Sequence, residues 1–231
     1  MPVVVVSLLT VTLFSLDRYG KHVRGMDADS LAKGAPEVIS VEHPVEAFYA
    51  WAGKGFRGRV VVSVSSRLYF VMPAADIIPA RMRFPLTPAN PAVTAAQDVR
   101  SEDFLRVAME TGIAREIVHI VPDPVFAEKL RPATQVEGAT VTDNVIHYPY
   151  FGSPRSIRTF RGVVSREEPA LVFIDASATR YLNAEGLYQA LKGAGIRTAF
   201  VVTSLSSGDP EVSDVERQEL KKFVSLLARG G

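Results

Sequence analysis

Two short runs of this sequence have the character of strands that are covered on both faces. Residues 59–64 read Arg-Val-Val-Val-Ser-Val, and residues 171–175 read Leu-Val-Phe-Ile-Asp. Neither run alternates apolar and polar residues as a half-exposed strand does, and near-continuous apolar runs of this length are typical of buried parallel strands. Because parallel strands must be joined by crossover connections, which are usually helical, these runs favour an α/β fold.

The remainder of the chain from residue 36 onward fits this interpretation. We expect further strands at residues 37–41, 116–121, 145–148, 157–160 and 196–203, and helices at residues 44–52, 101–111, 123–130 and 183–191. A last helix opens with the capping box Ser213–Glu216, and its apolar face consists of Val215, Leu220, Phe223, Val224 and Leu227. Residues 72–98, which contain five prolines, predict an extended loop. The prediction is one three-layer α/β domain over residues 36–231, with a mostly parallel sheet and helices on both faces.

Composition excludes several classes of function. The 231 residues contain 26 Lys and Arg against 25 Asp and Glu, and such a balance argues against a nucleic-acid partner bound through a broad basic face. The chain has no cysteine, which excludes disulfides, thiolate metal sites and a cysteine nucleophile. With four histidines, metal or acid–base chemistry must draw on a short list of residues, and His119 lies in an apolar strand and is expected in the core.

The first 35 residues form a separate part of the sequence, an apolar segment followed by a polar linker. Residues 2–16 carry no charge, although a membrane-spanning helix needs about 20 apolar residues. We favour a membrane anchor, with Arg18, Lys21 and Arg24 indicating a cytoplasmic body, or attachment to a protein partner through the same segment. The alternative is a buried β-strand in a soluble cytoplasmic protein, because the segment is rich in β-branched residues.

Polar residues follow three of the predicted strands. These are Glu42 and His43 after the first strand, residues 65–69 (Ser-Ser-Arg-Leu-Tyr) after the valine-rich strand, and Asp175 with Ser177 after the strand at residues 171–175. Ligands of open parallel sheets bind beyond the carboxyl ends of the strands, so these residues form a candidate site. The alternative is structural: His43 would cap its helix, Asp175 would hold a loop, and Arg67 would be a solvated strand end.

At these residues the chain resembles the arginase, agmatinase and deacetylase-like metallohydrolases. In that family a strand ends in an acid–His pair before a helix with aromatic residues, as Glu42-His43 does here before residues 44–51. The family's next strand carries Asp-x-His-x-Asp and a later one Asp-x-Asp, which correspond here to Ser65-x-Arg67-x-Tyr69 and Asp175-x-Ser177. The resemblance extends diffusely from residue 36 to the end and implies an arginase-like fold.

The resemblance also implies a degenerate metal site. His43 and Asp175 keep ligand types of the two-metal centre, whereas Ser65, Arg67, Tyr69 and Ser177 replace the other four. Hydroxyls are poor ligands for divalent metals, and a guanidinium repels them.

We therefore expect no bound metal or other cofactor and no catalytic residues. The predicted function is that of a non-catalytic binding or structural subunit, with a remnant site of Glu42, His43, Arg67, Tyr69 and Asp175. In this site Arg67 would pair with Asp175 or Glu42. The alternative is a hydrolase of a small amide- or guanidine-like substrate with a reduced or relocated site, using His43, Asp175 and either His147 or Glu42.

Overall fold

The computed structural model describes residues 36–70, 99–133, 138–148, 150, 152–162 and 166–229. The expectations for the apolar segment at residues 2–16, for its linker and for the loop at residues 72–98 lie outside these residues. Within the described parts of the chain, no helix is both long enough and apolar enough to cross a membrane.

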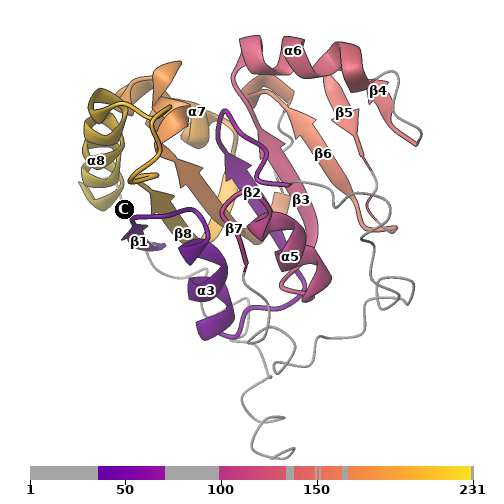
Figure 1. Ribbon diagram of the computed structural model, residues 1–231, viewed down its shortest axis with the longest axis horizontal. Helices are drawn as coiled ribbons and strands as arrows, with labels where there is room; N and C mark the ends of the chain where they lie inside the picture. Colours follow the sequence, from indigo (N-terminus) through magenta and orange to yellow (C-terminus); the bar gives the residue numbers. More distant parts are fainter. Residues whose placement is uncertain are drawn as a thin grey trace, which may run out of the picture.

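The described residues form one eight-stranded sheet in the order β1-β8-β7-β2-β3-β6-β5-β4 (Figure 1). All pairings from β1 to β6 along this order are parallel, and β5 and β4 extend the sheet antiparallel. The predicted α/β class with a mostly parallel sheet is thereby confirmed. The strands are β1 (Glu37–Val41), β2 (Arg59–Val64), β3 (Ala114–Ile120), β4 (Thr140–Thr142), β5 (Val145–His147), β6 (Arg155–Arg158), β7 (Arg166–Asp175) and β8 (Ile196–Ser204).

Helices cover both faces of the sheet (Figure 1). The helices are α3 (Glu46–Gly53), α5 (Phe104–Glu110), α6 (Asp123–Ala133), α7 (Ala184–Gly193) and α8 (Asp214–Arg229), with short 3-10 turns at η3 (Phe160–Gly162) and η4 (Ala176–Arg180). Helices α3 and α5 pack on one face, and α7 and α8 on the other. Helix α6 lies at the β6-β5 end, where Val125 and Phe126 pack with Ile146 and Ile157.

The alternation of side chains along the central strands explains why the apolar runs are continuous. On β2 and β7, Val61 and Phe173 point to the side of α3 and α5, while Val62 and Val172 point to the side of α7 and α8. Every residue of β2 from Val60 to Val64 is buried. The valine-rich run is therefore a strand with a hydrophobic layer on each face, as predicted.

Two predicted helix starts and one predicted apolar position differ from the structure. The helices expected from residues 44 and 101 begin at Glu46 and Phe104, because the residues before them form turns. Val215, predicted on the apolar face of α8, is 69% exposed, whereas the next residue, Glu216, is buried. The capping box turns Glu216 toward the protein, and a neighbouring helical position 100° away then faces solvent.

The predicted capping box at the start of α8 is present. The backbone N–H of Ser213 donates to Glu216 Oε2 (2.6 Å), and the N–H of Glu216 donates to Ser213 Oγ (3.3 Å). Arg180 Nε on η4 donates to the other carboxylate oxygen, Oε1, at 2.6 Å. Burial alone would raise the pKa of Glu216, but the hydrogen bonds from Arg180 and Ser213 outweigh burial and hold that pKa below its ordinary value.

We expect Glu216→Gln to lower the free energy of unfolding by about 1–2 kcal/mol at neutral pH. A depressed carboxyl pKa stabilises the fold above the ordinary value of 4.5 and ceases to do so as the pH falls through the folded value. The difference between wild type and variant should therefore shrink below about pH 4 in urea denaturation. The exposed Glu185→Gln serves as the control, and a pH-independent difference would contradict this account of Glu216.

Candidate functional site

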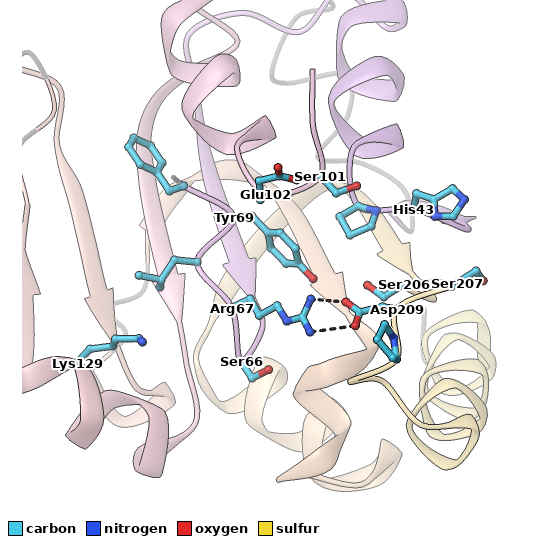
Figure 2. A pocket seen from close by; sticks show the side chains of 15 residues that line it. His43, Ser66, Arg67, Tyr69, Ser101, Glu102, Lys129, Ser206, Ser207 and Asp209 are labelled. Atoms are coloured by element: carbon cyan, nitrogen blue, oxygen red, sulfur yellow. Dashed lines mark hydrogen bonds and ion pairs between the residues drawn. The ribbon is translucent and has the colours of Figure 1, made fainter. Parts of the chain in front are cut away.

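A cleft of about 680 Å³ lies beyond the carboxyl ends of β1, β2 and β8. Because these strands run parallel in one sheet, their following loops meet at the same edge, where such sheets bind ligands. The cleft is lined by His43, Pro44, Ser66, Arg67, Leu68, Tyr69, Phe70, Ser101, Glu102, Lys129, Ser206, Ser207, Gly208, Asp209 and Pro210. Figure 2 shows Arg67 extending across the cleft toward Asp209, with Lys129 at the opposite end.

Arg67 is held by two carboxylates from the loop after β8. Its guanidinium makes a two-pronged contact with Asp209, in which Nη2 donates to Oδ1 at 3.1 Å, and it also pairs with Glu211. Partial burial would lower the pKa of Arg67, but the hydrogen bonds from its N–H groups to Asp209 and Glu211 outweigh burial and raise it. A bidentate guanidinium–carboxylate pair fixes orientation as well as charge.

The expected pairing of Arg67 with Asp175 or Glu42 is wrong. Asp175 and Glu42 bond instead to the serines that precede Asp209, because the hydroxyl of Ser206 donates to Asp175 and that of Ser207 donates to Glu42. The guanidinium of Arg67 therefore binds Asp209, which the loop after β8 supplies. Arg67 is also not a solvated strand end, since its side chain is 33% exposed and both of its Nη groups bond to these acids.

Asp175, the last residue of β7, is a completely buried carboxylate. The backbone N–H of Ser177 donates to its Oδ1 at 2.9 Å, and Ser206 donates to Oδ2. Burial raises the pKa of Asp175, although its hydrogen bonds oppose the shift. The expectation that Asp175 holds a loop is confirmed, and the loop is the one that carries Ser206 and Asp209.

Tyr69 closes the floor of the cleft beside Asp175. Its ring is buried against Phe104 and Phe173, with centroids 5.6 and 5.7 Å away. Its hydroxyl is buried without a hydrogen bond of good geometry to any described residue. Burial and then the charge of Asp175 raise the pKa of Tyr69, which keeps the phenol neutral.

Backbone strain is concentrated on either side of Asp175. Tyr69 and Ser206 both have φ of 48°, in the left-handed region that residues with a Cβ rarely adopt. The other two such residues among those described, Asp143 and Asn144, form the β4–β5 hairpin turn, where this conformation is ordinary. Strained residues that flank one buried acid are the kind of outlier that clusters at functional sites.

The structure brings most of the predicted site residues to this cleft. His43, Arg67 and Tyr69 line it, whereas Asp175 and the exposed Glu42 do not line it but accept hydrogen bonds from its serines, Ser206 and Ser207. His147, considered for the alternative hydrolase, lies on β5 and pairs in register with Ser156 near the start of β6. It therefore lies toward the opposite edge of the sheet, and the cleft does not include it. The predicted core position of His119 is confirmed, with no exposed surface.

The side chains at the metal-ligand positions of the resemblance do not fit a two-metal centre. Ser65 Oγ and Ser177 Oγ are 3.2 Å apart and bond to each other, and Ser65 Oγ also accepts from the backbone N–H of Arg67 at 2.9 Å. In the part of the chain that the structure describes, no three histidine or acidic side chains are grouped as metal ligands. These hydroxyls satisfy one another, and Arg67 adds a fixed positive charge to the same cleft.

Sequence reasoning missed the residues after β8. Ser206, Asp209 and Glu211 contribute the acceptors and donors that organise the cleft, together with Lys129 from α6 at its far end. The signal was available for the first three, because residues 206–211 (Ser-Ser-Gly-Asp-Pro-Glu) follow a predicted parallel strand at its carboxyl end, as the other candidate residues do. Lys129 gives no such signal from its position in a helix.

No family model matches this chain, and no curated protein is found that is similar to it.

We expect Asp175→Asn to raise the free energy of unfolding at neutral pH by on the order of 1 kcal/mol relative to the wild type. An asparagine can still accept from Ser177 and can donate to Ser206, while removing a charge that burial disfavours. A raised carboxyl pKa means that the wild type loses stability as the pH rises from the ordinary value of 3.8 through the folded value.

The advantage of the asparagine variant should therefore vanish at acid pH, as measured by urea denaturation between pH 3 and 8. Asp175→Ala, which removes both hydrogen bonds, should lose about 1–3 kcal/mol and serves as the control. An asparagine variant as unstable as the alanine variant would contradict this interpretation.

Proposed function

We propose that this chain is a non-catalytic binding protein with an arginase-like domain. The observation that carries the proposal is the Arg67 guanidinium, which is paired with Asp209 and Glu211 in the cleft where the resemblance implies a metal centre. In this interpretation a built-in cation takes over the charge that the metal ions would supply. The cleft remains open to a small ligand, and the charge remains fixed in the protein.

The arrangement of the strands supports this mapping. The resemblance concerns the segments after β1, β2 and β7, which are far apart in the sequence. The three strands run parallel in the same sheet, with β7 beside β2 and only β8 between β7 and β1. Their carboxyl ends therefore lie at one edge, as a shared ancestral site would require.

The chemistry of the cleft argues against metal-dependent hydrolysis. Such catalysis needs a water of lowered pKa and a Lewis acid to polarise the substrate, both of which come from metals held by carboxylates and imidazoles. Here His43 is exposed, Asp175 is buried and bonded to two serines, and Arg67 adds positive charge. The residues left in place have no evident role as nucleophile and base.

We expect purified protein that has been dialysed against Mn²⁺ and Zn²⁺, and then against metal-free buffer, to hold well below one equivalent of either metal. Elemental analysis measures this directly, and incubation with guanidine- and acetamide-type substrates should give no turnover above that of buffer. Two bound equivalents together with hydrolysis would contradict the proposal and favour the alternative hydrolase. In that event His43→Ala and Asp175→Ala should abolish both metal binding and hydrolysis.

The second part of the proposal concerns residues 2–16, whose apolar composition suggests attachment to a membrane or to a larger assembly. We expect the full chain to float with phospholipid vesicles, or to sediment as a large complex from cell extract, and a variant lacking residues 1–16 to do neither. If both proteins stay in the soluble fraction without detergent as small species, the segment is not an attachment site, and the β-strand alternative is favoured.

A further inference from the structure

Arg155, the first residue of β6, is a nearly buried cation that no carboxylate among the described residues balances. The residue is 9% exposed, and no carboxylate among the described residues forms an ion pair with it. Its Nε–H donates to Nε2 of His119 at 3.1 Å. Its guanidinium carbon lies 3.9 Å from the ring centre of Phe70 and 5.5 Å from that of Tyr148.

The histidine cannot balance this charge. His119 is fully buried, and burial together with the charge of Arg155 holds its pKa well below the ordinary value, so the ring is neutral. Because Nε2 accepts from Arg155, the ring proton resides on Nδ1. That Nδ1 is also buried and has no partner among the described residues. Within the described part of the chain, Arg155 and His119 therefore present donors without an acceptor and a positive charge without an acid beside it.

A buried charge of this kind is costly for a protein that has no use for it. Burial lowers the pKa of Arg155 to about 10, which reflects the unfavourable environment of the guanidinium. The faces of Phe70 and Tyr148 offset part of this cost by cation–π attraction, but they carry no net charge and accept no strong hydrogen bond. Buried charges are ordinarily paired, and the partner that would balance this guanidinium is an anion, which the described residues do not supply.

Arg155 does not itself line the cleft, and its backbone lies at the start of β6, but its side chain reaches His119 near the carboxyl end of β3 and Phe70 after β2. Phe70, which stacks on the guanidinium, also lines the cleft. Lys129 lines the cleft at the end away from Arg67, and the charges of both Arg155 and Lys129 act on the phenol of Tyr148. The acid that pairs with Lys129 is its sequence neighbour Glu128, which is 69% exposed and therefore interacts weakly. Lys129 and the nearby Arg155 make this end of the cleft basic, whereas the guanidinium of Arg67 at the other end is already paired with Asp209 and Glu211.

We propose that Arg155, Lys129 and Tyr148 form an anion subsite at the α6 end of the cleft, which takes the carboxylate or phosphate group of a small ligand. Two cations and a phenol hydroxyl supply the donors that such groups prefer, and Phe70 forms an apolar wall beside them. The subsite rests on the proposed binding function, because it specifies which ligands the cleft accepts.

The test uses inorganic phosphate and acetate as probes, each titrated into the full chain at constant ionic strength with chloride as the reference anion. We expect phosphate, acetate or both to raise the melting temperature in a saturable manner, because a ligand that binds only the folded state stabilises it. Phosphate alone would indicate a phosphate ligand, and acetate alone a carboxylate. No response of the wild type to either anion beyond that to chloride would overturn the subsite.

Arg155→Met separates binding from structure. It should abolish the anion response while leaving the melting temperature without anion equal to or higher than that of the wild type, because it removes an unpaired buried charge. Loss of stability with an undiminished anion response would mean that Arg155 is only structural. The surface variant Arg115→Met, which breaks the exposed pair with Glu168, is the control and should keep the full response.

If Arg155→Met fails to fold, Lys129→Ala tests the subsite instead, because the partly exposed Lys129 of α6 can be replaced without disturbing the core. We expect its dissociation constant for the effective anion to rise by about fivefold to tenfold, which corresponds to one lost charge-assisted contact. An unchanged constant would overturn the subsite. These results are independent of the metal analysis. A protein that binds metals and hydrolyses a substrate would disprove the non-catalytic function. Anion binding would still depend on Arg155 and Lys129.

Discussion

The buried carboxylate of Asp175 organises the carboxyl-terminal edge of the sheet. It ends the central strand β7, where both faces are covered and water cannot satisfy a charge. Ser177 from the turn after β7 and Ser206 from the loop after β8 bond to it, so the position of that loop is tied to the core. The loop then carries Asp209 to Arg67, and the cleft follows from this sequence of contacts.

Two arginines, Arg67 in the cleft and Arg155 behind Phe70, are held in opposite ways. Arg67 is paired with acids and serves as a fixed part of the wall. Arg155 is nearly buried, lacks an acid among the described residues and faces aromatic rings. A paired cation stabilises geometry, whereas an unpaired buried one is retained at a cost to stability, as is common for residues that serve binding. The strained backbone of Tyr69 and Ser206 beside Asp175 is a second cost in the same region.

The central strands could be predicted because burial on both faces imposes a continuous apolar run, as in β2 and β7. Strand β4 was missed because its three residues are exposed and depend on pairing with β5 rather than on a pattern of their own. In the site, the tendency of ligands to bind beyond the carboxyl ends of parallel strands identified Arg67 and Asp175 but not the acid that binds Arg67. Asp209 lies 142 residues from Arg67 in the chain, and charge alone could not select it among 25 acidic residues.

The central claim is that the Arg67 cation is built into the fold by Asp209. A double-mutant cycle of Arg67→Met and Asp209→Asn in urea denaturation tests it most directly. Because both side chains are partly exposed, at 33% and 20%, we predict a coupling free energy of about 1 kcal/mol, decreasing at high salt. Additive effects of the two substitutions would contradict the claim, since Asp209 would then not hold Arg67 in the fold.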